Sequence, residues 1–352
     1  MTVFLESHNI NNKAGGLGTF NYQLIKALSK LDLKSIAITL NAKHPEHLKE
    51  EFGKTFQYAK YKSLERYPLF RKKTKYDVWH SLNQNTKVEP FFKPKKYILS
   101  IHDVNFVEEI ASDMNHEVNK RFIAKLNRAD VITYISEFAK QQTHEYFDVP
   151  NVPEHIIYNG NPSETILENN TFQPDFELKQ PFFYSIGDFI PRKNFLSLVK
   201  MMANIDEYLL ILSGNNDKEY GREIEKYIKE NNLENRVILT GKVSEEAKQF
   251  YLKNCTAFLF PSIREGFGLP PIEAMQFDKP VFLSTLTSLP EIGGDAAFYW
   301  ENFDPIYMKE FLYSTLETFS KNREFYVDKI RQRAHFFSWE KAAKLYLELY
   351  NN

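Results

Sequence analysis

The chain has 352 residues, of which 43% are hydrophobic, and this length is sufficient for two globular domains. Its formal net charge of −1 excludes a bulk electrostatic attraction to nucleic acid. The first residues become polar at once and no apolar run is long enough to span a bilayer, so we expect neither a signal peptide nor a transmembrane helix.

Short apolar runs alternate with amphipathic stretches along the first half of the chain, which is the pattern of an α/β parallel sheet. The expected strands are residues 3–5, 35–40, 78–80, 97–101 and 131–135. The expected helices are residues 18–31, residues 119–128 and a helix that begins at Ser136.

A second series of the same kind begins after the unpatterned stretch 162–181. Its expected strands are residues 182–186, 208–213, 237–240, 256–260 and 280–284, with helices between them, including 194–202. A terminal helix, 339–350, carries Ala342, Leu345 and Leu349 on one apolar stripe. We therefore predict two doubly wound Rossmann-like domains, 1–168 and 169–338. Ligands of such sheets bind beyond the carboxyl ends of the strands, so we expect the domains to face each other across a cleft.

The stretch 265–275 follows an apolar run typical of a buried strand, and it places two glutamates eight residues apart. Between them, the Gly266-Phe267-Gly268 loop allows close approach to a ligand, and the proline pair 270–271 marks a helix start whose amides suit a phosphate. Glu273, expected in the first helical turn, would accept hydrogen bonds from a ribose diol. Glu265 would lie beside a sugar attached to the phosphates. The alternative interpretation is a helix capped by acidic residues.

This string resembles the Glu-x7-Glu motif of retaining GT-B glycosyltransferases, most closely the mannosyltransferase-like bacterial members of family 4. The resemblance continues in chain order over nearly the whole sequence. The other matching motifs are Asn12-Lys13-Ala14-Gly15-Gly16-Leu17-Gly18, Ile101-His102-Asp103, Tyr184-Ser185-Ile186-Gly187, Pro191-Arg192-Lys193-Asn194, Thr240-Gly241-Lys242-Val243, Leu289-Pro290-Glu291 and Gly294-Asp295-Ala296-Ala297. The resemblance implies a GT-B fold with two domains. Residues 1–168 form the acceptor-side domain, residues 169–338 bind the nucleotide sugar, and the helix 339–352 crosses back to the first domain.

The resemblance also implies roles for these residues. Arg192 and Lys193 would neutralise the leaving diphosphate, Glu265 would hold hydroxyls of the donor sugar, and His102 would lie near that sugar. The expected donor-binding residues are Gly15, Gly16, Gly187, Arg192, Lys193, Gly241, Lys242, Val243, Glu265, Gly266, Phe267, Gly268, Leu269 and Glu273. Without the resemblance, Arg192 and Lys193 are typical of a solvated turn and His102 of a structural histidine.

The implied function is retaining transfer of a hexose from a nucleotide diphosphate sugar, GDP-mannose first and a UDP-sugar next, to a glycan or lipid-linked acceptor in surface polysaccharide synthesis. Two alternatives stay open: a nucleotide-sugar 2-epimerase and a non-catalytic glycan-binding protein. The nine histidines show no ligand spacing, so we expect no metal and no cofactor. The single cysteine, Cys255, has no adjacent positive partner, so we interpret it as a core residue of a protein in the reducing cytosol.

The segment 54–75 is rich in lysine and arginine, has only Glu65 as an acidic residue, and interleaves aromatic residues. Lys93, Lys95 and Lys96 follow nearby. A solvated basic face is one interpretation. Docking to the anionic inner leaflet of the plasma membrane is the sharper one, because each basic residue near such a surface contributes about 1 kcal/mol. Nucleic acid is the least favoured partner.

Overall fold

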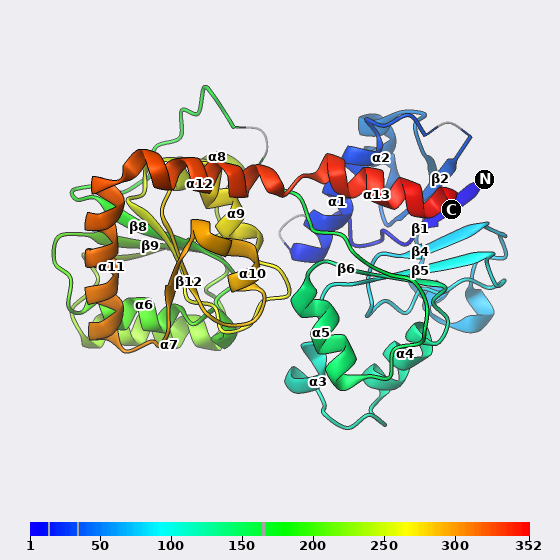
Figure 1. Ribbon diagram of the computed structural model, residues 1–352, viewed down its shortest axis with the longest axis horizontal. Coiled ribbons are helices and arrows are strands. Elements are labelled where there is room, and N and C mark those ends of the chain that lie inside the picture. Colours follow the sequence, from blue (N-terminus) through cyan, green and yellow to red (C-terminus); the bar gives the residue numbers. More distant parts are fainter. Residues whose placement is uncertain (13–14, 34, 164–165) are drawn as a thin grey trace. The chain divides into compact units, whose positions relative to one another are not determined.

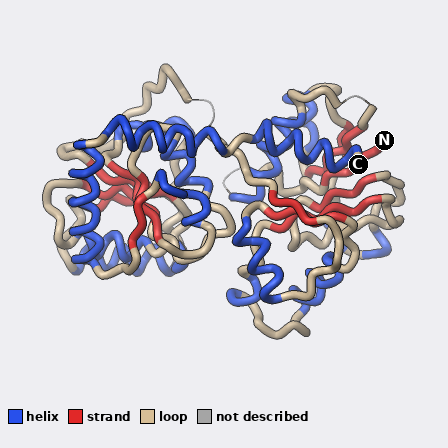
Figure 2. The backbone as a smooth tube through the Cα atoms, in the orientation of Figure 1, coloured by secondary structure: helices blue, strands red, loops and turns tan. Residues whose placement is uncertain are grey.

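The computed structural model describes residues 1–12, 15–33, 35–163 and 166–352, and the chain forms two compact units. Unit 1 comprises Met1–Pro162 and Ser338–Asn352, and unit 2 comprises Ser163–Phe337. Each unit contains a sheet with helices packed around it (Figures 1 and 2). The boundaries expected from the sequence, 168/169 and 338/339, lie slightly later in the chain than these.

Unit 1 is built on a seven-stranded parallel sheet in the order β3-β2-β1-β4-β5-β6-β7. Its strands are β1 (Thr2–Leu5), β2 (Ala37–Ala42), β3 (Gln57–Lys60), β4 (Val78–Ser81), β5 (Lys96–Ile101), β6 (Val131–Tyr134) and β7 (Glu154–Ile156). Its helices are α1 (Gly16–Leu28), α2 (Pro45–Phe52), α3 (Phe106–Glu109), α4 (Glu117–Leu126), α5 (Glu137–Tyr146) and α13 (Trp339–Asn351). Two short 3₁₀ turns, η1 (Ser63–Arg66) and η2 (Pro68–Phe70), follow β3.

The terminal helix α13 belongs to unit 1 and packs against α1. The stripe expected on this helix was wrong, because Leu345 is exposed while Tyr346 and Tyr350 are completely buried. The Tyr350 hydroxyl lies 2.8 Å from Nδ1 of His80 on β4, so the buried phenol keeps a polar partner. Aromatic side chains with satisfied hydroxyls, not the leucines, therefore hold α13 in unit 1.

Unit 2 is built on a six-stranded parallel sheet in the order β10-β9-β8-β11-β12-β13. Its strands are β8 (Phe182–Ile186), β9 (Leu209–Ser213), β10 (Val237–Gly241), β11 (Ala257–Phe260), β12 (Val281–Ser284) and β13 (Phe298–Trp300). Its α-helices are α6 (Phe195–Met202), α7 (Glu219–Glu230), α8 (Glu245–Asn254), α9 (Leu269–Met275), α10 (Leu289–Gly293), α11 (Pro305–Lys321) and α12 (Arg323–Phe336). Its 3₁₀ turns are η3 (Pro191–Lys193) and η4 (Gly294–Ala296).

The sheet of unit 2 is apolar on both faces, as a parallel sheet covered by helices requires. Successive side chains of a strand point to opposite faces, and Phe183 and Leu259 accordingly enter one core cluster while Tyr184 and Phe258 enter the other. Cys255 is also buried there, and burial raises the pKa of its thiol to about 12, in keeping with a core role. The prediction of two doubly wound α/β units is confirmed.

Candidate active site

Two loops of unit 2 begin side by side where the strand order of the sheet reverses. β8 and β11 are paired, but the chain continues from β8 to β9 on one side and from β11 to β12 on the other. Such a switch point, outside the carboxyl ends of the strands, is where doubly wound sheets bind ligands. The first loop contains η3 with Arg192 and Lys193, and the second contains Glu265. The fold therefore brings the adjacent residues Arg192 and Lys193 together with Glu265, which lies 72 positions after Lys193 in the sequence.

These three side chains form a charged cluster. The Lys193 Nζ lies 2.5 Å from Glu265 Oε1, and Arg192 Nη1 lies 3.7 Å from Glu265 Oε2. Lys193 and Glu265 are 9% and 8% exposed, whereas the Arg192 side chain is 34% exposed. The Lys193 ammonium also lies 4.7 Å from the centre of the Phe260 ring. Lys193 and Glu265 thus form a buried ion pair, and Arg192 is the cation that reaches solvent.

Hydroxyl groups fix the loop that carries Glu265. Ser262 Oγ lies 2.7 Å from Glu265 Oε1 and 2.9 Å from the Arg192 carbonyl oxygen, so it links the two loops. The backbone N–H of Glu265 donates to Thr287 Oγ1 at 3.1 Å, and Ser288 Oγ donates to the Glu265 carbonyl at 3.0 Å. Such contacts hold a charged side chain in one orientation before a ligand arrives, which is the arrangement that electrostatic catalysis requires.

The helix that follows this loop begins as the prolines predicted. Gly268 precedes α9 with φ 112° and ψ 63°, a conformation that requires glycine. A Cβ there would lie 3.0 Å from Leu289 Cδ2. Prolines 270 and 271 carry no N–H, so Leu269 is the one donor among the first three residues of α9.

Glu273 lies deeper in the structure than the sequence indicated. It is the fifth residue of α9, so the expectation that it occupies the first helical turn was wrong. The carboxylate is buried, and its Oε1 accepts from Ser163 Oγ at 3.0 Å and from Lys248 Nζ at 2.5 Å. Burial acts to lower the pKa of Lys248, but the carboxylates of Glu273 and Glu245 outweigh it and raise that pKa to about 12. Both contacts recorded among the described residues use Oε1, which leaves Oε2 for a ligand.

Glycines join the neighbouring loops at the same edge of the sheet. The Gly187 N–H donates to the Ser213 carbonyl at 2.9 Å, and the Gly214 N–H donates to the Gly241 carbonyl at 2.8 Å. A Cβ on Gly214 would lie 1.8 Å from the Gly187 carbonyl oxygen, so no larger residue fits. Beyond Gly241, the Lys242 side chain is exposed, whereas Val243 packs against the core.

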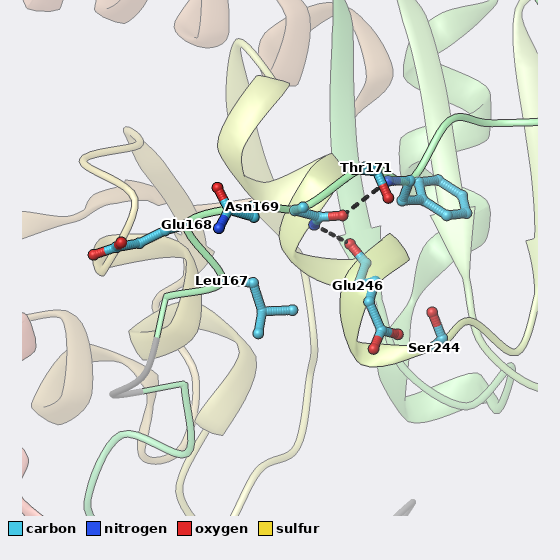
Figure 3. Close-up of a pocket in the computed structure, with 8 residues that line it drawn as sticks. Leu167, Glu168, Asn169, Thr171, Ser244 and Glu246 are labelled. Atoms are coloured by element: carbon cyan, nitrogen blue, oxygen red, sulfur yellow. Dashed lines mark hydrogen bonds between the residues drawn. The ribbon is translucent and has the colours of Figure 1, made fainter.

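A surface hollow of about 530 Å³ lies beside the start of α8 (Figure 3). It is lined by residues 167–172 together with Ser244 and Glu246. The Asn170 amide fixes this segment by donating to the Glu246 carbonyl at 2.7 Å; in Figure 3 this hydrogen bond is the dashed line that ends at Glu246. None of the predicted site residues lines it, and we assign it no part in the candidate site.

The predicted residues of unit 1 occupy loops at the carboxyl edge of its own sheet. His102 directly follows β5 and is buried, with the Phe20 ring edge-on at 4.5 Å. Its Nε2 donates to the Leu82 carbonyl at 2.9 Å, which assigns the proton to Nε2 and leaves Nδ1 as an acceptor. Burial lowers the pKa of His102 to about 4, so the imidazole is neutral at physiological pH.

The glycine loop of unit 1 leads into α1. Gly15 precedes the helix and Gly16 is its first residue. A Cβ on Gly15 would lie 3.2 Å from the Asn12 amide, while Gly16 has open space around it. Lys13 and Ala14, which belong to the same predicted motif, lie outside the described residues.

Comparison with known proteins identifies the family to which the chain belongs. The family model described as "Glycosyltransferase Family 4" matches residues 14–164, and the model "Glycosyl transferases group 1" matches residues 168–305. The serotype-specific mannosyltransferase WbdA of Escherichia coli is 27% identical over 290 residues, which cover 76% of this chain and 35% of WbdA. The chain belongs to the family 4 GT-B glycosyltransferases.

One further relative supports this family membership, and one solved structure shares the fold. The O-antigen chain mannosyltransferase RfbU of Salmonella typhimurium is 26% identical over 217 residues, covering 60% of this chain and 54% of RfbU. HepE of Anabaena, solved in complex with UDP-glucose, matches with a TM-score of 0.75 and 15% identity over 99% of each chain. At that identity the likeness shows the fold. The chain spans about a third of WbdA and about half of RfbU.

The geometry adds residues that sequence reasoning missed in this glycosyltransferase. Ser262, Thr287 and Ser288 position Glu265, and Lys248 holds Glu273. Lys248 lies one helical turn after Glu245 and pairs with it at 2.8 Å, but this spacing gives no sequence signal for the contact with Glu273. Among the residues that the structure describes, no helix has both the length and the apolarity to cross a bilayer. Within that same part of the chain, no cluster of metal-binding side chains was found.

Proposed function

We propose that this glycosyltransferase moves a hexosyl group, with retention at the anomeric carbon, from a nucleotide diphosphate sugar to a glycan or lipid-linked saccharide. GDP-mannose is the first candidate donor, because the relatives WbdA and RfbU are mannosyltransferases, and a UDP-sugar is the second. The observation that carries the proposal is the cluster of Arg192, Lys193 and Glu265 at the switch point of unit 2.

Arg192 is the residue best placed to neutralise the leaving diphosphate. Its guanidinium reaches solvent beside the loop that leads to Gly268 and Leu269, and a guanidinium donates two parallel hydrogen bonds to phosphate oxygens. Lys193 has a different role in this proposal from the one the sequence indicated. Its ammonium is held by Glu265, so it holds that carboxylate in one orientation and acts on the diphosphate through the local field.

Glu265 would then act on the donor sugar. Its Oε1 already accepts from Lys193 and Ser262, whereas within the described part of the chain Oε2 has the single, longer contact to Arg192. Oε2 can accept a hydrogen bond from a sugar hydroxyl. Its negative charge stabilises the positive charge that develops at the anomeric carbon. Preorganised charge of this kind accounts for a rate factor of about 10²–10³ per group.

Glu273 and the Lys242–Val243 loop would hold the nucleoside. The free Oε2 of Glu273 can accept from a ribose hydroxyl, and the backbone beyond Gly241 would contact the base. In unit 1, the neutral His102 offers Nδ1 as a hydrogen-bond acceptor for a sugar hydroxyl. We propose that the leaving phosphate takes the proton of the acceptor, and that the positive charge of Arg192 and Lys193 makes a metal ion and a cofactor unnecessary.

Product analysis tests this function against its alternatives. The protein is incubated with GDP-mannose or a UDP-hexose, first alone and then with a mannose-containing or lipid-linked saccharide. A transferase releases the nucleoside diphosphate and forms a longer glycan with the acceptor. Conversion of the donor to its 2-epimer without any acceptor would instead support the epimerase, and nucleotide binding without any product would support a glycan-binding protein. We propose that the reaction takes place on the cytoplasmic side of the plasma membrane, where the free Cys255 fits a reducing environment.

A further inference from the structure

One edge of unit 1 exposes large apolar side chains close together. Leu69 is 86% exposed, and Leu64, Tyr67 and Phe70 are each more than half exposed. These residues come from η1 and η2, and the exposed Phe91 and Phe92 come from the segment before β5. We call residues 62–75 together with 91–93 the basic–apolar face. Contiguous exposed apolar groups of this kind mark an interaction site, whereas single exposed residues do not.

The two segments of the basic–apolar face are neighbours in space. The Phe91 and Phe92 rings lie 4.9 Å apart. The Lys73 ammonium lies 5.5 Å from the centre of the Phe91 ring, and the Lys75 ammonium lies 5.3 Å from that of Phe92. Basic and aromatic side chains are therefore interleaved on one surface of unit 1.

Internal contacts hold this face in place and correct the residue set expected from the sequence. Glu65 is buried, and Lys72 Nζ lies 3.5 Å from its Oε1 and 3.0 Å from Asn41 Oδ1. Lys72 therefore anchors the segment to β2 and does not belong to its outer surface. Phe56 and Tyr61, which the sequence placed among the interfacial aromatic residues, are buried in unit 1. These internal contacts therefore hold the exposed turn 63–70 in place on unit 1.

The basic–apolar face carries a positive charge that few acidic side chains neutralise. Its outward basic residues are Lys62, Arg66, Lys73, Lys75 and Lys93. Glu65, the one acid within 54–75, is paired with Lys72, and Asp77 beyond it is paired with Lys95 at 2.8 Å. A surface with free cations and exposed leucine and phenylalanine matches an anionic bilayer, because headgroups meet the cations and the acyl region meets the apolar tips.

We propose that the basic–apolar face docks this protein on a bilayer that contains anionic lipids, with Leu69 and Phe70 inserted at the interface. Each basic residue near such a surface strengthens binding roughly fivefold. The attraction is screened over about 8 Å at physiological salt, so binding falls as salt rises. Exposed leucine side chains form no hydrogen bonds or ion pairs with nucleic acid phosphates. A lipid surface therefore matches this face better than an oligonucleotide does. The proposal does not depend on which sugar is transferred.

Co-sedimentation with vesicles tests the proposal on the full chain. Vesicles of phosphatidylcholine with about a third phosphatidylglycerol should pellet the protein at low salt, and pure phosphatidylcholine vesicles should not. A variant that replaces Lys62, Lys73 and Lys75 with Ser should bind roughly a hundredfold more weakly. Leu69→Asp should reduce binding by roughly tenfold or more, because it removes the most exposed apolar tip.

Matched changes in unit 2 provide the controls. Lys226, Lys229 and Lys253 are exposed lysines whose replacement with Ser removes the same charge. Phe325 is 58% exposed with the Lys329 ammonium 4.8 Å from its ring centre, so Phe325→Asp matches the change at Leu69. We expect both controls to bind vesicles like the unchanged protein.

Affinity for a nucleoside diphosphate, measured by calorimetry, separates this proposal from the proposed reaction. All of these variants should bind the nucleotide like the unchanged protein. Three results would overturn membrane docking: no enrichment on anionic vesicles at low salt, equal loss in the unit 2 controls, or tighter binding to a single-stranded oligonucleotide than to the vesicles.

Discussion

Removal of the Lys193 ammonium should destabilise unit 2, whereas removal of the Arg192 guanidinium should not. Lys193 is 9% exposed and its Nζ lies 2.5 Å from Oε1 of Glu265, which is itself 8% exposed. Lys193→Ala leaves the carboxylate buried, with Ser262 as a neutral donor and Arg192 at 3.7 Å. Breaking a buried pair by removing one partner costs about 3–5 kcal/mol.

That loss should be visible as a shift in melting temperature. For a unit of this size, 1 kcal/mol corresponds to about 2–4 °C, so Lys193→Ala should lower the melting temperature of unit 2 by about 6–20 °C in differential scanning calorimetry. Lys193→Met retains the aliphatic stem beside Phe260 and separates lost packing from lost charge. Arg192→Ala is the matched control, because its partly exposed side chain is solvated, and we expect a shift of about 2 °C or less.

A double variant separates the loss of the ion pair from the loss of either residue alone. Lys193→Met combined with Glu265→Gln removes both charges, so it should be less destabilising than Lys193→Met alone. Equal melting temperatures for Lys193→Ala and Arg192→Ala would refute the buried ion pair. So would a double variant that loses the sum of the two single effects.

Three further outcomes follow from the site. Glu273→Gln should weaken binding of the nucleoside diphosphate in calorimetry, while Glu265→Gln should preserve that affinity and lower kcat roughly a hundredfold; equal effects on affinity would contradict the separate roles. Burial lowers the pKa of His102 to about 4 and of His80 to about 3, so the unfolded chain binds more protons below about pH 6.5 and the melting temperature should fall as the pH drops from 6.5 to 4. His102→Gln should flatten that dependence, and an unchanged slope would argue against a neutral buried imidazole. Transferase activity should persist in excess EDTA, because Arg192 and Lys193 supply the positive charge; complete loss that magnesium or manganese restores would contradict this.

The sequence predicted the strands that carry the site because they are apolar on both faces. Phe182–Ile186 and Ala257–Phe260 follow this pattern. The edge strand Gln57–Lys60 contains no apolar run, because it pairs only with β2 and its side chains are exposed or half-buried, so no sequence pattern indicates it.

Side-chain contacts within the site were less predictable than the strands. The glycine loop and the proline pair correctly located the start of α9, and the motifs selected Arg192, Lys193 and Glu265. The pairing of Lys193 with Glu265 needed the fold, because 72 residues separate them. The contact of Lys248 with Glu273 likewise joins two different helices, and periodicity within one helix carries no information about it.

We propose that Arg192 binds the diphosphate of a nucleotide sugar at the switch point of unit 2, and calorimetry tests this binding most directly. A thermal-shift screen of GDP, UDP, ADP and dTDP first selects the preferred nucleotide. Calorimetry then compares that nucleoside diphosphate with its nucleoside in the unchanged protein and in Arg192→Ala. A hydrogen bond to a charged group contributes about 1.5–3 kcal/mol, so Arg192→Ala should weaken diphosphate binding by roughly 10- to 150-fold and leave nucleoside binding unchanged. Equal diphosphate affinity in the two proteins would contradict the account.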